Sequence, residues 1–194
     1  MRKVIYGMMV SLDGYIETPG REIDWILIDE ELHKYVNEQE SAVDTYLYGR
    51  RMYQLMAAFW PTADEDPAAP DFIVEFARIW KQTPKVVFSK TLERVDWNAR
   101  LVRDDVAGEI DRLKQQPGKD IEVGGADLAS TVMKLGLIDE FWLYVQPVIL
   151  GGGKRMLPAL EERINLRLVE TRPFSSGVVL LHYRRAEQAE VGSV

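Results

Sequence analysis

Three short segments of the chain carry glycines, arginines or other polar residues suited to binding a phosphorylated molecule. The first consists of Gly124, Gly125, Ala126, Asp127 and Leu128, and it separates a strand-like segment from a helical one. Its glycines allow close backbone approach, and the helix that follows offers unpaired N–H groups and a positive dipole end to a pyrophosphate. A plain tight turn explains a glycine pair equally well, and the Asp127 carboxylate could instead cap the helix. The segment therefore predicts a phosphate site only in combination with the other two.

The second segment, Gly49-Arg50-Arg51, places two guanidinium groups where a helix is expected to begin. Cations are disfavoured at that end of a helix, and an anionic ligand would offset the local cost. Arginine binds phosphate through a planar fork, so a ribose 2′-phosphate is a suitable partner, which favours NADPH over NADH. The third segment, Ser89-Lys90, ends another predicted strand and could complete the same phosphate site. The alternative is that Arg50 and Arg51 are solvated surface arginines, and a serine and a lysine are each common in turns.

A reduction by hydride transfer from C4 of a dihydronicotinamide also requires a proton source near the acceptor. We select Asp13, just past the first predicted strand, Glu30, at the start of a helix, and Tyr144, a polar residue within an apolar strand, as candidate catalytic residues. Asp29 and Glu122 are further carboxylates near predicted strand or helix ends. Turn formation explains Asp13 and helix capping explains Asp29, so the sequence leaves the proton donor open.

The composition excludes several other kinds of site. The chain has no cysteine, which rules out disulfides, thiolate metal sites and a cysteine nucleophile. Its only histidines are His33, expected on a helix surface, and His182, expected in a strand without a role, so no metal site is predicted. A net charge of -7 argues against general attraction to nucleic acid or anionic membranes. Because no apolar run approaches the roughly 20 residues that a membrane span needs, we expect a soluble cytoplasmic protein.

The predicted secondary structure places the candidate segments where strands end. Residues 4–10 are almost wholly apolar without alternation, which predicts a strand covered on both faces in the middle of a sheet. Further strands are predicted at residues 45–48, 84–89, 100–102, 121–123 and 141–150, and helices at residues 29–41, 50–59, 72–80, 106–115 and 128–135. Residues 166–171 and 178–183 predict a closing hairpin. Strands that alternate with helices and then follow one another indicate an α/β fold with a mostly parallel sheet finished by antiparallel strands. We expect one domain at residues 1–185 and a disordered tail at 186–194.

Four of these segments together resemble a known family. The first three are Val10-Ser11-Leu12-Asp13-Gly14-Tyr15-Ile16, Leu47-Tyr48-Gly49-Arg50-Arg51 and Val123-Gly124-Gly125-Ala126-Asp127-Leu128-Ala129. The fourth runs from Gly136-Leu137-Ile138-Asp139-Glu140 to Pro147-Val148-Ile149-Leu150-Gly151-Gly152-Gly153. Their order and spacing are similar to those of the riboflavin-biosynthesis reductase domain, within the dihydrofolate-reductase-like superfamily, over nearly the whole chain. The resemblance implies a three-layer αβα fold and an NADPH-dependent oxidoreductase. The implied substrate is a pterin-like or phosphoribosyl-aminopyrimidine-like heterocycle, and the implied assembly is a homodimer.

The resemblance also assigns expected roles to individual residues. The cofactor would lie across the carboxyl ends of the strands, with its nicotinamide near Val10 and Trp25. Its phosphates would be held by residues of all three segments, namely Gly49, Arg50, Arg51, Ser89, Lys90, Gly124, Gly125, Ala126, Asp127 and Leu128. Trp25 is equally suited to core or lid packing.

Two positions depart from the family pattern. Met52 stands where many relatives have a threonine, which removes a hydroxyl that could bond the cofactor. Val123 stands where the riboflavin enzymes have a substrate-binding glutamate, and Glu122, one residue earlier in a strand, should point to the opposite face. Riboflavin synthesis is therefore not established by the resemblance. Two alternatives stay open: a catalytically silent nucleotide-binding homodimer on the same fold, and a reductase that uses a flavin.

Overall fold

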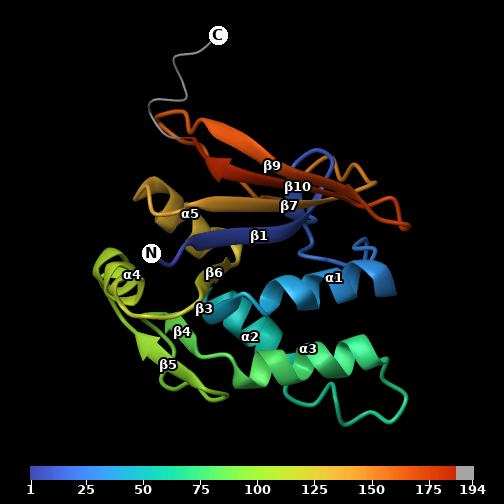
Figure 1. Ribbon diagram of the computed structural model, residues 1–194, viewed down its shortest axis with the longest axis horizontal. Coiled ribbons are helices and arrows are strands. Elements are labelled where there is room, and N and C mark those ends of the chain that lie inside the picture. The colour runs from blue at the N-terminus through green and yellow to red at the C-terminus, as the bar shows by residue number, and fades with distance from the viewer. Residues whose placement is uncertain (187–194) are drawn as a thin grey trace.

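The computed structural model describes residues 1–186 and consists of an eight-stranded sheet between two layers of helices (Figure 1). The strands are β1 Val4–Ser11, β2 Tyr15–Glu17, β3 Val43–Gly49, β4 Lys85–Phe88, β5 Ala99–Val102, β6 Asp120–Gly124, β7 Glu140–Gln146, β8 Lys154–Arg155, β9 Leu166–Pro173 and β10 Val179–Arg185. The helices are α1 Glu30–Glu40, α2 Arg50–Phe59, α3 Asp71–Gln82, α4 Val106–Gln115 and α5 Ala126–Lys134. Every strand and helix predicted from the sequence is present.

The main sheet has the strand order β5-β4-β3-β6-β1-β7-β10-β9. The six strands from β5 to β7 are parallel, whereas β10 runs antiparallel to β7 and β9 antiparallel to β10. The predicted α/β class, with a mostly parallel sheet and an antiparallel end, is therefore confirmed. The apolar strand β1 lies between β6 and β7 in the interior of the sheet, as its lack of alternation indicates.

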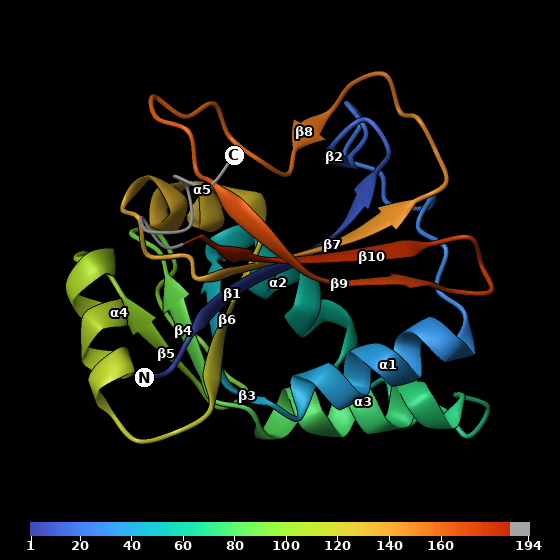
Figure 2. The ribbon, with the colours of Figure 1, turned by 45° about the horizontal axis from the view of Figure 1, so that its top comes forward.

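Each face of the sheet has its own core. Helices α4 and α5 cover one face, where Ile110, Val132 and Met133 pack against β1 and β6. Helices α1, α2 and α3 cover the other face, where Leu32 and Trp80 pack against strands that include β3 and β7 (Figure 2). Successive side chains of a strand point to opposite faces of the sheet. Val123 accordingly lies under α4 and α5, and Glu122 points to the opposite face, as expected.

Three details of the chain path differ from the sequence prediction. Strand β7 ends at Gln146 rather than at residue 150. Pro147 has no N–H to donate, and the amides of Leu150 and Gly151 donate to the Asp13 carboxylate instead of to a neighbouring strand. Strands β2 and β8 form a separate two-stranded ribbon that the sequence did not predict. Ala186 donates its N–H to the Asn165 carbonyl at 2.9 Å, and the remainder of the predicted tail lies outside the described residues.

His33 is buried, not on a helix surface. Its imidazole is surrounded by the rings of Trp60, Phe72 and Phe76 and contacts Asn37 at 3.1 Å. Burial lowers the pKa of His33, which favours the neutral ring. The error arose because the aromatic residues that cover this side of α1 lie in or next to α2 and α3, far along the chain.

Candidate functional site

The three phosphate-suited segments lie next to one another where the parallel strands β3, β4 and β6 end. Strand β3 lies between β4 and β6, with Gly49 opposite Phe88 and Tyr48 opposite Gly124. The turns that follow these three strands are therefore neighbours at the carboxyl ends of parallel strands, where ligands bind in open α/β sheets. A Cβ atom added to Gly49 would lie 3.7 Å from the Cβ of Leu128, which places the starts of α2 and α5 side by side.

Close packing between the turns explains the glycine pair. A Cβ on Gly124 would lie 2.6 Å from Cε1 of Tyr48, closer than real Cβ contacts allow. Gly125 adopts a φ of 89°, and a Cβ there would lie 3.0 Å from the Cβ of Met52. The glycines therefore let the two turns approach each other. Neither α2 nor α5 has a side chain that caps its first N–H groups, and these remain suited to an anion.

Arg51 and Asp127, both assigned to the phosphate site, pair with the β2–β8 ribbon. Arg51 donates to both carboxylate oxygens of Glu17, in β2, at 2.8 and 2.5 Å. Lys154, in β8, forms an ion pair with Asp127 at the start of α5. Asp127 therefore points toward a cation. The two ion pairs attach the ribbon to both helix ends that border the candidate site.

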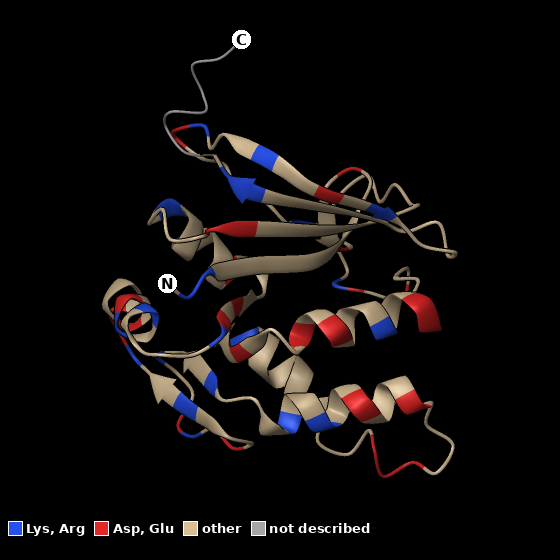
Figure 3. Ribbon diagram, viewed as in Figure 1, with Lys and Arg blue, Asp and Glu red and all other residues tan. Residues whose placement is uncertain are grey.

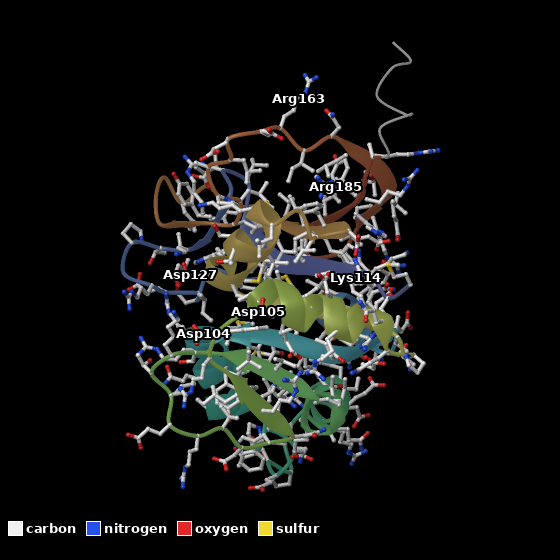
Figure 4. The ribbon with its side chains drawn as sticks, turned by 90° about the vertical axis from the view of Figure 1, so that its left-hand side faces the viewer. Asp104, Asp105, Lys114, Asp127, Arg163 and Arg185 are labelled. Carbon is white, nitrogen blue, oxygen red and sulfur yellow. The ribbon has the colours of Figure 1, made fainter. Side chains whose placement is uncertain are left out.

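Arg50, Ser89 and Lys90 extend the site toward β4. Nη1 of Arg50 donates to Oγ1 of Thr91 at 3.1 Å, which directs the guanidinium to the turn after β4. The Ser89 hydroxyl accepts from the amides of Thr91 and Leu92 at 3.2 and 3.1 Å and so shapes that turn. Lys90 pairs with Asp104 at 3.1 Å, with both side chains largely exposed. Asp104 and Asp127 lie toward the same edge of the molecule (Figure 4).

Asp13 acts as an anchor between two loops. It accepts hydrogen bonds from the Ser11 hydroxyl at 2.7 Å, the Leu150 amide at 3.1 Å and the Gly151 amide at 2.7 Å. These bonds, that from Ser11 first, lower the pKa of Asp13 to about 2. The carboxylate is therefore ionised near neutral pH and holds the end of β1 to the loop after β7. This geometry does not suit a proton donor.

The other sequence-selected residues have different environments. Glu30 is exposed and pairs with Lys34 at 2.6 Å. Trp25 is partly buried and donates its indole N–H to the Glu22 carbonyl at 3.2 Å. The side chain of Val10 is buried under α4 and α5. None of these contacts identifies a proton donor.

Tyr144 lies deep in the core beneath α1. Burial, followed by the nearby carboxylates of Glu122 and Glu40, raises its pKa well above the ordinary tyrosine range. Its neighbour Glu40, the last residue of α1, was not selected from the sequence. The sequence does show that Glu40 and Glu122 are acidic residues at positions where apolar residues of the core would be expected. Only the packing of α1 on the sheet brings the two side chains together.

Within residues 1–186, no group of acidic residues and histidines is arranged to hold a metal ion. In the same part of the chain, no helix is both long and apolar enough to cross a membrane.

Comparisons with known proteins agree with this architecture. Residues 2–180 match the family described as the RibD C-terminal domain. The protein YyaP of Bacillus subtilis (strain 168) is 39% identical over 185 residues, which cover 94% of each chain. A Shewanella sp. PV-4 protein whose name places it in riboflavin biosynthesis has a similar structure, with a TM-score of 0.76 at 20% identity, over 96% of this chain and 100% of that chain. Dihydrofolate reductase from Enterococcus faecalis, in complex with NADP(H), gives a TM-score of 0.65 at 12% identity over 95% of this chain and 97% of that chain.

Proposed function

The chain belongs to the RibD C-terminal domain family, and from this premise we propose that it is an NADPH-dependent reductase of a pterin-like or aminopyrimidine-like heterocycle. The observation that carries the proposal is the meeting of three turns at one carboxyl edge of the sheet. Two helices begin there side by side without side-chain caps, next to Arg50 and Arg51. Their amide groups and arginines suit the phosphate groups of a dinucleotide.

The residues present fit this cofactor. The N-termini of α2 and α5 would hold the pyrophosphate, and Arg50, with Ser89 and Lys90 beyond it, would hold the 2′-phosphate. When bound, NADPH supplies a hydride from C4 of its dihydronicotinamide. The chain's own contribution is to bind and orient the cofactor at the strand ends, with Asp13 fixing the loops that border β1.

The test is a fluorescence titration with NADPH, followed by NADPH oxidation with a panel of pterins and aminopyrimidines. Arg50→Ala should weaken NADPH binding by about tenfold or more, because a charge-assisted contact contributes about 1.5 to 3 kcal/mol. The same variant should change NADH binding much less, because NADH lacks the 2′-phosphate. A protein that neither binds NADPH nor oxidises it with any of these compounds would rule out the proposal. Equal losses for both cofactors would place Arg50 at the pyrophosphate.

A second candidate is cofactor binding without turnover, because hydrogen bonds from the Ser11 hydroxyl and the Leu150 and Gly151 amides engage both carboxylate oxygens of Asp13 and leave this sequence-selected residue as an anchor between loops. This candidate predicts a tight NADPH complex that no heterocycle oxidises. A yellow purified protein would instead indicate the flavin alternative.

We also propose that the protein is a homodimer, as its family resemblance implies. Strand β9 forms an edge of the sheet and exposes the apolar side chains of Leu166, Leu168 and Val169. Apolar edge strands are surfaces that a second chain can cover. Analytical ultracentrifugation gives the oligomeric state directly, and a monomer over a wide concentration range would exclude this assembly.

A further inference from the structure

A cavity of about 600 Å³ lies at the amino ends of β3, β4 and β5, at the opposite end of these strands from the candidate cofactor turns. Basic residues of β5 and α4 border the cavity, although the protein has a net charge of -7 (Figure 3). Strand β3 has 7 residues, so roughly 20 Å of strand separates its two ends. The cavity is therefore separate from the candidate cofactor site.

Two arginines that line the cavity share a single carboxylate. Glu109 of α4 pairs with Arg100 of β5 and accepts hydrogen bonds from Arg112 through both carboxylate oxygens, at 2.7 and 2.8 Å. Burial, and then the charge of Arg112, lower the pKa of Arg100, since the two guanidinium groups repel each other. The two arginine side chains remain 43% and 53% exposed. This cluster therefore has one more positive charge than its carboxylate balances, and an anion in the cavity would reduce the repulsion.

The other charged groups of the cavity do not remove this excess of positive charge. Arg2 pairs with Asp44, so these two charges balance each other. The buried ammonium group of Lys85 donates to two backbone carbonyls and has no carboxylate partner within residues 1–186. Asp96 is the one lining carboxylate that pairs with no cation of the described chain, and it can accept hydrogen bonds from amino or hydroxyl groups of a ligand. The cavity thus suits an anion that also carries hydrogen-bond donors.

Trp97 provides an exposed aromatic ring in the same cavity. It is 46% exposed and belongs to neither hydrophobic core of residues 1–186. Its φ is 62°, in the left-handed region that bulky residues rarely adopt. Hydrogen bonds fix the residues on either side: the Asp96 amide donates to the Tyr53 hydroxyl at 2.8 Å, and the Asn98 carbonyl accepts from the Lys85 amide at 2.9 Å. The fold therefore maintains a strained turn that holds an indole toward solvent, and core packing does not explain it.

We propose that this cavity is a second binding site, for a mononucleotide-like molecule whose ring stacks on Trp97 and whose phosphate lies between Arg100 and Arg112. Guanidinium groups bind phosphate in a bidentate way, and the phosphate supplies the negative charge that the shared carboxylate does not. Stacking on an indole tolerates any base, because every base has a π-face, so the geometry specifies the class of ligand and not the base. A cavity of about 600 Å³ is within the usual range for sites that bind small molecules. This site is additional to the proposed reductase function and does not depend on it.

The experiment titrates three probes into the full chain by calorimetry, with and without NADPH: AMP, adenosine and ribose 5-phosphate. AMP should bind at least about tenfold more tightly than either of the others, because adenosine lacks the phosphate and ribose 5-phosphate lacks the ring. Saturation with NADPH should leave the AMP affinity unchanged, since the cavity is separate from the cofactor turns. No binding of AMP, equal affinities for the three probes, or competition between AMP and NADPH would each overturn the inference.

Four variants locate the AMP site. Trp97→Ala and Arg112→Gln should each weaken AMP binding by about tenfold, whereas Trp97→Phe should keep most of the affinity because a phenyl ring still stacks. Arg163→Gln, in the loop between β8 and β9, removes the same charge from an exposed position and should bind AMP as the wild type does. Unchanged AMP binding in both Trp97→Ala and Arg112→Gln would place AMP elsewhere and overturn the inference.

A second measurement uses the wild-type protein and so does not depend on how the Ala and Gln variants fold. The chain has 5 tryptophans, and ¹⁵N labelling of their indoles gives one resonance for each, with that of Trp97 identified by its loss in Trp97→Phe. AMP should shift the Trp97 resonance, and adenosine at the same concentration should shift it less. A Trp97 resonance that does not respond to AMP would overturn the inference. Failure of NADPH binding alone would instead overturn the reductase proposal and leave the nucleotide cavity to be decided by these AMP measurements.

Discussion

The ion pair between Glu17 and Arg51 makes a specific prediction about cofactor affinity. The pair is bidentate, at 2.8 and 2.5 Å, with the Arg51 side chain 47% exposed and that of Glu17 only 12% exposed. If Arg51 binds a cofactor phosphate, Glu17 must first release it. Glu17→Gln should therefore tighten NADPH binding, because the neutral amide keeps the side-chain length and loses the competing charge.

The expected gain follows from two contributions. Half-exposed ion pairs are worth up to about 1 kcal/mol, and this is the cost of releasing Arg51. Removing a negative charge roughly 5 Å from a phosphate in a mostly aqueous environment contributes up to about 1 kcal/mol more. Together these contributions amount to about 1 to 2 kcal/mol, a five- to thirtyfold lower Kd. The gain should decrease at high salt because exposed charges are screened.

The assay is a fluorescence titration with NADPH at low and high ionic strength. Glu161→Gln, an exposed residue in a different loop, makes the same change in net charge and should leave the Kd unchanged. Arg51→Ala in the Glu17→Gln background should remove the gain. A Kd that stays the same or rises in Glu17→Gln would show that Arg51 does not contact the phosphates, and the assignment of this residue to the site would fail.

Three further predictions concern stability. Gly153→Ala should lower the free energy of unfolding by about 1 to 3 kcal/mol, because φ is 128° and the new Cβ would overlap the Glu17 carbonyl. Urea unfolding measures the change, and an equal effect of Gly152→Ala would contradict this explanation. The pKa of Lys85 is lowered by burial from 10.5 to about 8, so the folded protein releases this proton at a lower pH than the unfolded chain. As pH rises from 8 to 10.5, the stability of the wild type should therefore increase by up to about 3 kcal/mol relative to Lys85→Met. Parallel stability profiles of the two proteins against pH would refute this. The pKa of His33 is also lowered by burial, so stability should fall as pH drops below 6.5 because the unfolded chain gains the proton first. His33→Phe should remove this part of the pH dependence, and chemical denaturation across the pH range measures it.

Much of the fold could be predicted from local sequence patterns. The apolar run that became β1, the helix that begins after Asp29 and the junction at Gly49 are each specified by neighbouring residues through burial, capping and turn preferences. The family resemblance led us to expect the Gly49 and Gly124 turns at one cofactor site, but that β3 and β6 are neighbours was decided by the strand order of the sheet. The early end of β7 did not follow, since it depends partly on the Asp13 carboxylate, which comes from the other end of the chain.

The candidate site shows the same division. The sequence determined which segments carry glycines and arginines, because these residue types and spacings are local properties of the chain. Only the tertiary structure decided that Arg51 pairs with Glu17, that Asp13 is an anchor and that the Glu122 carboxyl lies within hydrogen-bond reach of Glu40. The physical reason is that charge pairing, burial and the resulting pKa shifts depend on side chains brought together by strand order and helix packing, and these partners lie far apart in the sequence.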